Sequence, residues 1–407
     1  SQNNLENQLY QKLGELPYPP PTQIYPKGKG VRPALFTQMD SVREVYNPVR
    51  EQFAGTKDGA IYLRKLNQAA ILVIQQMPMN GWTWDIEGAM WSPDGQLLAV
   101  KQINEEGVPL IELQLDSITK YKKGYTRAGQ ALPKHQYYIV NIASGTVDLV
   151  KHGQEHPYIH SIGWSADSKK MRFLRSGRLM KKIDILEFDV SKKNIREIFS
   201  EESNTYLVGL GLLQGKDEEL KRKKQVVFLD STFIWQSESS GYNQLYLYDL
   251  EGKLIQPLTS LEKNGIVYEL CFVDKGFVYF MASASLDQVY ERHLFRASLN
   301  QPNIEKIVVG PQLYLSGTSK HKDTLWIDRV ETYRFSVELY TPSGALIDKI
   351  GSADLSFLQD EGYQPEYLWV NAPGNDARMP ALLIKPKNFD PSKKYPVIEY
   401  LYAGSHT

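Results

Sequence analysis

The sequence has little cysteine, no excess of charge of either sign and no long apolar run. Its one cysteine, Cys271, excludes an internal disulfide and a cysteine-based structural zinc site. Cys271 lies in the apolar run 267–272, which predicts a buried structural thiol. The 47 Lys and Arg residues balance 47 Asp and Glu residues, so charge gives no reason to expect nucleic acid or an anionic membrane as a partner. No apolar run is long enough for a membrane-spanning helix.

Amphipathic helical patterns are also scarce. Residues 4–13 are the best helical candidate, and the proline-rich residues 17–21 must be extended. Beyond about residue 45, apolar and polar residues alternate in short runs separated by turn-forming residues, which is typical of strands. The 407 residues exceed one ordinary compact domain, and the 11% aromatic content favours strands. The chain is therefore predicted to be all-β.

An internal repeat indicates the architecture. Five segments share one layout of a strand, a polar turn and a second strand. Their equivalent positions are Asn141, Asp189, Asp249, Ala297 and Thr341. The spacings are 48, 60, 48 and 44, and the longest contains a polar insertion at 214–225. The string W-S-P-D-G at 91–95 is echoed by W-S-A-D-S at 164–168.

A four-stranded unit every 40–50 residues is typical of a β-propeller blade. We predict a propeller over residues 50–365 with eight blades, or with seven as the alternative. One large sandwich, or two, is the other architecture that fits the strands. Residues 1–49 are expected to form an N-terminal extension that packs against the propeller or the domain after it.

The composition changes in residues 366–407. Two apolar strands are predicted there, at 380–386 and 397–402. The second is almost continuously apolar, which suits a sheet covered on both faces, as in an α/β domain. We expect these residues to be the first strands of an incomplete α/β domain.

No motif for a cofactor or a metal is convincing. The string H-G-Q-E-H at 152–156 matches a zinc-peptidase pattern, but Gly153 and Pro157 argue against the helix that it needs, so we predict a loop between blades. The string G-W-S-A-D at 163–167 lacks the last glycine of a nucleophile elbow, and no complete G-x-S-x-G occurs. Glu105 and Glu106 fit a solvated hairpin tip. We predict no cofactor and no metal site.

Several strings together resemble the dipeptidyl peptidase IV family of prolyl-oligopeptidase-type serine peptidases. They are A-M-W-S-P-D-G (89–95), G-V-P-L-I-E (107–112), F-I-W-Q-S-E-S-S-G-Y-N-Q-L-Y-L-Y-D (233–249), E-R-H-L-F (291–295), K-K-Y-P-V (393–397) and Y-A-G (402–404). The resemblance implies an eight-bladed propeller that caps an α/β-hydrolase domain. It also implies that the catalytic Ser, Asp and His follow Thr407, so that this chain alone is inactive.

The resemblance suggests three site residues. Tyr402 occupies the family's Y-A-G motif, whose tyrosine donates a hydrogen bond to the developing oxyanion; the alternative is a structural tyrosine that ends a buried strand. The family's aminopeptidases carry a Glu-Glu pair before the W-S-P-D-G turn that binds the substrate ammonium. No such pair stands here, and Asp85 and Glu87 are the candidate replacements. Release of dipeptides, tripeptides or other oligopeptides is left open.

Two functions follow from this reading. One is the propeller portion of a serine exopeptidase that hydrolyses peptides, often after Pro or Ala, from the N-terminus. The other is a stand-alone propeller that acts as a binding or scaffold module. The expected partners are a peptide substrate, the chain's own C-terminal hydrolase domain and, as a further option, a second copy in a homodimer. The start at Ser1, without Met or an apolar leader, fits export to the periplasm or cell envelope and equally fits a trimmed chain.

Overall fold

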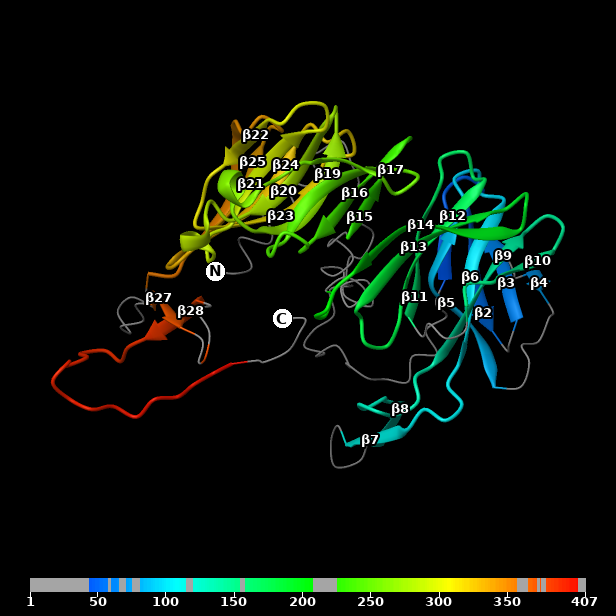
Figure 1. Ribbon diagram of the computed structural model, residues 1–407, viewed down its shortest axis with the longest axis horizontal. Coiled ribbons are helices and arrows are strands. Elements are labelled where there is room, and N and C mark those ends of the chain that lie inside the picture. The colour runs from blue at the N-terminus through cyan, green and yellow to red at the C-terminus, as the bar shows by residue number, and fades with distance from the viewer. Residues whose placement is uncertain are drawn as a thin grey trace, which may run out of the picture.

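The computed structural model is all-β and describes residues 44–57, 60–65, 71–74, 81–114, 120–153, 158–207, 225–356, 365–371, 374 and 378–401. Six four-stranded antiparallel sheets follow one another along this part of the chain (Figure 1). In each sheet the strands neighbour one another in chain order. This repeated meander confirms the all-β prediction and the repeat of four-stranded units.

The first three sheets are built as follows. The first consists of β1 (Glu44–Asn47), β2 (Gln52–Lys57), β3 (Ala60–Lys65) and β4 (Ile71–Ile74). The second consists of β5 (Trp82–Trp91), β6 (Leu97–Asn104), β9 (Lys134–Asn141) and β10 (Val147–Val150). A hairpin of β7 (Leu110–Gln114) and β8 (Lys120–Gly124) extends from the second sheet between β6 and β9. The third consists of β11 (Tyr158–Trp164), β12 (Lys170–Ser176), β13 (Lys182–Asp189) and β14 (Asn194–Glu202).

The remaining sheets repeat the pattern. The fourth consists of β15 (Val226–Phe228), β16 (Thr232–Ser237), β17 (Gln244–Asp249) and β18 (Leu254–Pro257), followed by the short helix α4 (Leu261–Asn264). The fifth consists of β19 (Val267–Asp274), β20 (Phe277–Ala282), β21 (His293–Ser298) and β22 (Ile304–Val308), with the 3-10 turn η1 (Leu286–Gln288) before β21. The sixth consists of β23 (Gln312–Thr318), β24 (Leu325–Glu331), β25 (Arg334–Tyr340) and β26 (Leu346–Asp354). A separate hairpin pairs β27 (Pro365–Asn371) with β28 (Arg378–Ile384).

The five positions predicted to be equivalent do occupy one place in five sheets. Each lies at the end of a third strand, where the chain turns into the fourth. Asn141, Asp189 and Asp249 are the last residues of β9, β13 and β17. Ala297 is the last but one of β21, and Thr341 follows β25 directly.

The two tryptophan turns are equivalent as well. Trp91 and Trp164 end the first strands of the second and third sheets. Each indole Nε1–H donates a 3.1 Å hydrogen bond to a backbone carbonyl in the first strand of the preceding sheet, Val45 for Trp91 and Met90 for Trp164. A tryptophan at this place therefore joins its sheet to the sheet before it.

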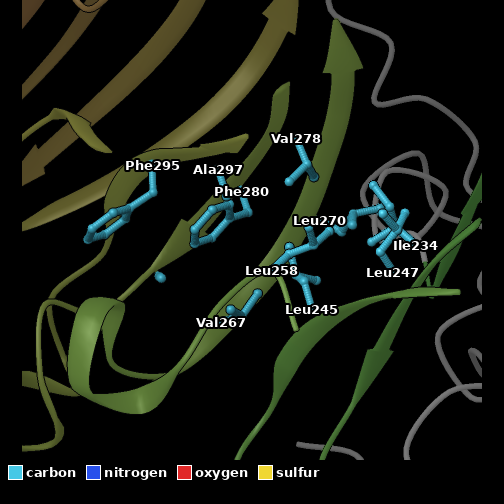
Figure 2. Close-up of a cluster of buried hydrophobic side chains, with 11 residues drawn as sticks. Ile234, Leu245, Leu247, Leu258, Val267, Leu270, Val278, Phe280, Phe295 and Ala297 are labelled. Carbon is cyan, nitrogen blue, oxygen red and sulfur yellow. The ribbon is translucent and has the colours of Figure 1, made fainter. Parts of the chain in front are cut away.

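The core is divided among the junctions between sheets. Five apolar clusters lie one at each junction between consecutive sheets. Because side chains of a strand alternate between faces, an inner sheet contributes to two of them. Leu98 and Val100 of β6 face the first sheet, whereas Ala99 faces the third. Figure 2 shows the cluster between the fourth and fifth sheets, where Ile234 and Leu245 meet residues such as Phe280.

Two expectations can be judged directly in the described chain. Cys271 is buried in β19 and forms no disulfide, as predicted. The prediction of a strand at 397–402 is wrong for residues 397–401, because residues 394–401 form no strand; residue 402 lies outside the described chain. An extended segment becomes a strand only when another strand satisfies its backbone, and none pairs with it here. Ile398 is 95% exposed and Tyr400 is 97% exposed.

Other expectations are not decided by this fold. The helix expected at 4–13, the prolines at 17–21 and the polar insertion at 214–224 lie outside the described residues. The number of blades, the closure of a ring and the identity of residues 366–407 as the start of a hydrolase domain stay predictions.

Candidate functional site

Each sheet has two ends that differ in their connections. We call the end at which each first strand begins the connector end; Trp82 marks it in the second sheet and Val267 in the fifth. Each second strand also ends there, and each third strand starts there. Trp82 pairs with Asn104, the last residue of β6, and Val267 pairs with Ala282, the last residue of β20. The opposite end, which carries the tryptophan turns, is the turn end.

Neighbouring sheets point their connector ends the same way. The backbone N–H of Val267, at the start of the fifth sheet, donates a 3.0 Å hydrogen bond to the carbonyl of Asn243, just before the third strand of the fourth. The backbone N–H of Arg292, just before the third strand of the fifth sheet, donates a 3.0 Å bond to the carbonyl of Pro311 at the start of the sixth. The connector ends of these sheets therefore form a common surface.

Asp85, the first candidate contact for a substrate ammonium, is already engaged. One carboxylate oxygen lies 3.1 Å from Nζ of Lys101 on the neighbouring strand β6. The other accepts a 2.9 Å hydrogen bond from the backbone N–H of Glu87. Asp85 is thus a partly buried ion-pair residue that also fixes the backbone at Glu87.

Glu87, the second candidate, lies in a bulge of β5. The pairing with β6 jumps from Asp85–Lys101 to Met90–Ala99, so residues 86–89 face only one residue of β6. Gly88 allows this detour with φ of +76°, and its carbonyl accepts a 2.7 Å bond from Ser161 of β11. The bulge therefore holds Glu87, which is half-buried, at the border between the second and third sheets.

A cluster of ionisable side chains lies beneath these carboxylates. Burial disfavours the ammonium of Lys101, but Tyr137, Asp85 and Glu87 outweigh this and raise the pKa of Lys101. Burial, with the charge of Lys101, lowers the pKa of His135 to about 4. Burial lowers the pKa of His160, on β11, to about 3, and Lys101 and His135 add to this effect. Lys101 is therefore charged and both histidines are neutral near pH 7.

Tyr402, the candidate oxyanion donor, lies outside the described residues. The hairpin before it is anchored at the connector end of the fifth sheet. The ring of Tyr367 in β27 stacks on Tyr290 with centroids 4.0 Å apart. Arg378 at the start of β28 lies 3.4 Å from the carboxylate of Asp287 in η1. The hairpin β27–β28 thus lies at the connector end of the fifth sheet (Figure 1).

The other motifs take up structural places. His152 follows β10 in the connection to β11, as predicted, and its Nε2 lies 3.1 Å from the carbonyl of His135. Residues 154–157, which include His156 of the zinc-peptidase pattern, lie outside the described chain. Ser165 belongs to the repeated turn, where its hydroxyl donates to Asp167 at 2.6 Å. Glu105 and Glu106 are exposed at the end of β6, as predicted.

Three further properties of the described part of the chain bear on its function. No group of three or more His, Cys, Asp or Glu side chains is placed to bind a metal ion there. Within the same ranges, no helix is long and apolar enough to cross a membrane. A shallow pocket opens at the turn end between the first three sheets; its lining is Val45, Tyr46, Pro48, Ala89, Met90, Trp91, Pro93 and Trp164. It contains no carboxylate, imidazole or ammonium, so it offers no acid–base chemistry.

Two charged residues of this surface were not singled out in the sequence. Lys101 directly follows the apolar residues 97–100 of β6, and this change from apolar to charged was the available signal. Arg292 is part of the string E-R-H-L-F, but nothing in the string indicates which of its polar residues is free to bind. Both assignments need the packing of neighbouring strands.

Comparison with known proteins gives a consistent result. The model of the family described as "Dipeptidyl peptidase IV (DPP IV) N-terminal region" matches residues 84–327. Dipeptidyl peptidase 4 of Trichophyton tonsurans is 22% identical over 352 residues, which cover 78% of this chain and 42% of the relative. A probable dipeptidyl-aminopeptidase B of Aspergillus fumigatus is 22% identical, covering 88% of this chain and 43% of its own length. The chain thus spans less than half of these relatives.

Solved structures agree on the fold. The crystal structure of Porphyromonas gingivalis dipeptidyl peptidase 4 superposes with a TM-score of 0.71 at 17% identity, covering 87% of this chain and 52% of that one. A putative dipeptidyl aminopeptidase IV from Bacteroides ovatus gives a TM-score of 0.66 at 20% identity, covering 88% and 53%.

Proposed function

Because the chain belongs to the family of dipeptidyl peptidase IV N-terminal regions, we propose that it is the propeller portion of a serine exopeptidase. In this proposal the sheets position a peptide, and an α/β-hydrolase domain that follows supplies the Ser-Asp-His triad. The family match over residues 84–327 carries the proposal. The hairpin β27–β28 supports it, because the stacking of Tyr367 on Tyr290 places the hairpin, which precedes the predicted hydrolase strands, at the connector end of the fifth sheet.

We propose that the N-terminal ammonium of the peptide is bound near β5. Asp85 lies 3.1 Å from the ammonium of Lys101, and Asp85 and Glu87 both raise the pKa of Lys101, so the two carboxylates favour a positive charge at this place. Both residues are candidates for the contact with the substrate ammonium. Asp85 also fixes the backbone at Glu87 by accepting its N–H.

We propose that Tyr402 donates its hydroxyl to the oxyanion of the tetrahedral intermediate. A donor that is fixed before the reaction stabilises charge that appears only in the transition state. Hydrolysis by the absent serine would then proceed with this chain contributing one oxyanion donor and the amine contact. Export and a homodimer remain part of the proposal.

The test compares the chain with the complete protein. The complete protein should release short peptides from unblocked N-termini, and a phosphonate should label one serine beyond Thr407. The chain 1–407 should show neither turnover nor labelling. A labelled serine within residues 1–407 would contradict the proposal that the catalytic serine lies in a following domain. A complete protein that binds peptides without hydrolysing them would instead favour a binding or scaffold module.

A further inference from the structure

The hairpin β27–β28 is attached to a loop of the fifth sheet. We call this loop, residues 285–292, the anchor loop; it contains η1 and leads into β21. The ring of Tyr367 in β27 stacks on the ring of Tyr290, with centroids 4.0 Å apart and planes at 12°. The guanidinium of Arg378 in β28 lies 3.4 Å from the carboxylate of Asp287. Each strand of the hairpin therefore has its own contact with the anchor loop.

The anchor loop is itself held by two sheets. The hydroxyl of Tyr268 in β19 donates a hydrogen bond to the carbonyl of Val289. Cζ of Arg292 lies over the ring of Tyr268, 5.1 Å from the centroid, and over that of Tyr314 in β23, 4.8 Å from the centroid. The backbone N–H of Leu313 donates a 3.0 Å hydrogen bond to the carbonyl of Arg292. The position of the loop is therefore fixed by contacts with the fifth and the sixth sheet.

The hairpin carries apolar side chains that the anchor loop leaves exposed. Leu382, Leu383 and Ile384 are each at least 40% exposed. Because neighbouring side chains of a strand point to opposite faces, exposed apolar groups lie on both faces of the hairpin. A two-stranded sheet by itself is at best marginally stable in water. We therefore expect further chain to cover the hairpin, and the proposed function assigns this cover to the hydrolase domain that follows β28.

A domain that includes the hairpin takes its position from the anchor loop. We propose that Tyr290 and Asp287 form the docking contact that fixes the hydrolase domain against the propeller, an inference that rests on the proposed function. Peptide hydrolysis in that function needs both parts, because the sheets bind the peptide and the hydrolase domain supplies the serine. A displacement of about 1 Å between binding and reacting groups can lower the rate about a hundredfold. Tyr290 is thus a positioning residue, which acts by holding the two parts in a fixed relative position.

The test uses the complete protein and two reactions. Hydrolysis of an unblocked peptide needs the propeller and the hydrolase domain together, whereas labelling of the serine by a small alkyl fluorophosphonate needs the hydrolase domain alone. Tyr290→Ala should lower kcat/KM for the peptide by at least about tenfold and leave the labelling rate within twofold of the parent. Tyr290→Phe keeps the stacked ring and should change neither rate. Tyr46→Ala is the matched control, because it removes a ring that pairs with Phe53 at the turn end, and it should also change neither.

The other ring of the contact gives an independent check. Tyr367→Ala should lower the peptide reaction and spare the labelling, as Tyr290→Ala does. The two changes together should cost little more than either one alone, because both remove the same contact. Tyr367 is about half exposed, so Tyr367→Ala decides should Tyr290→Ala not fold.

The outcomes separate this inference from the function on which it rests. If the alanine variants lower both reactions equally, or lower neither, the stacked rings do not set the relative position of the two parts and the inference fails alone. If the parent hydrolyses no unblocked peptide and the phosphonate labels no serine beyond Thr407, the proposed function fails and takes the inference with it.

Discussion

At the scale of single residues, Tyr402 gives the most direct test of the proposed chemistry. Tyr402→Phe in the complete protein should lower kcat by about 10²–10³, because one oxyanion donor is lost. KM should change little, since the bond forms mainly in the transition state. The change removes only a hydroxyl, so the melting temperature should stay close to that of the parent. A kcat within twofold of the parent would make Tyr402 a structural residue.

Glu187 is a residue on which the packing of the third sheet depends. Its carboxylate, 2% exposed, contacts Lys170 at 2.9 Å, Arg172 at 3.0 Å and Arg196 at 3.0 Å. Glu187→Gln would leave the buried Arg172 without its counter-charge. We expect the free energy of unfolding, measured with urea at pH 7, to fall by about 3–5 kcal/mol.

The control and the pH dependence make this prediction specific. Glu251→Gln removes an exposed partner of the same Arg196 and should cost at most about 1 kcal/mol. Burial opposes ionisation of Glu187, but Lys170, Arg196 and Arg172 outweigh it and lower the pKa of Glu187. Its contribution is therefore full above the unfolded pKa and lost as pH falls through the folded one. Equal losses for the two variants would contradict the assignment.

The buried His160 gives a second reason to expect that acid lowers the stability of the fold. It faces Lys101 and His135 and has a pKa of about 3, whereas an unfolded histidine titrates near 6.5. Only the unfolded state binds the proton between these values, so stability should fall as pH drops from about 6.5 toward 3, by about 1.4 kcal/mol per pH unit. His160→Phe should therefore gain stability relative to the parent as pH falls.

The matched control for this prediction is His321→Gln, at an exposed turn of the sixth sheet. Because His321 is exposed, its replacement should change the free energy of unfolding by at most about 0.5 kcal/mol. If His160→Phe shows the same difference from the parent at pH 7 and pH 5, His160 is protonated in the folded protein and its assignment as a buried neutral group is wrong.

At the scale of elements, the turns between third and fourth strands carry a close contact between sheets. Gly252, in the turn after β17, has φ of +78°, and a Cβ there would overlap the carbonyl oxygen of Ile198 in the fourth strand of the preceding sheet. Gly344 meets the carbonyl of Ile307 in the same way, at the junction of the fifth and sixth sheets. These glycines let consecutive sheets approach each other.

We therefore expect Gly252→Ala to destabilise the chain strongly. Gly241→Ala is the matched control, because Gly241 has φ of +95° but nothing lies within 4 Å of its added Cβ. In the control, the left-handed backbone of an alanine should lower the free energy of unfolding by about 1–2 kcal/mol. Gly252→Ala should lower it clearly further, as measured by urea unfolding. If both variants lose the same amount, the turn has room to move and the contact does not hold the sheets together.

Sequence periodicity predicted the elements that repeat and failed for those that do not. The end of the third strand could be placed in five sheets because a turn signal recurs there after an apolar strand. The hairpin β7–β8 was not predicted, since an insertion inside a repeat has no periodic signal. The strand at 397–401 was predicted wrongly, because apolar residues indicate burial but do not provide a pairing partner.

The candidate site was less accessible to sequence reasoning than the fold. Asp85 and Glu87 could be proposed from their place before the W-S-P-D-G turn, but not the pairing of Asp85 with Lys101 across the β5–β6 ladder. The aromatic contacts of Arg292 join residues from different strands and sheets. Such contacts follow from the register of strands, which composition does not specify.

At the scale of the whole molecule, the stacking of sheets explains why their order matters. Each inner sheet is apolar on both faces, so it is stable only between two neighbours. Five junctions are filled in this way among the six sheets.

The segment after β28 allows a final prediction about the complete protein. Val397 and Ile398 are 86% and 95% exposed in this chain, and a run of such side chains needs a cover. If a hydrolase domain supplies it, Ile398→Asp should lower the melting temperature of the complete protein by several degrees, since a charge would replace buried apolar surface. The same change in chain 1–407 should leave the melting temperature unaltered, because Ile398 already faces water. Asn388→Asp, at an exposed turn before the segment, controls for the added negative charge. If Ile398→Asp leaves the complete protein equally stable, the segment is not part of a covered sheet, and the proposed junction between propeller and hydrolase lies elsewhere.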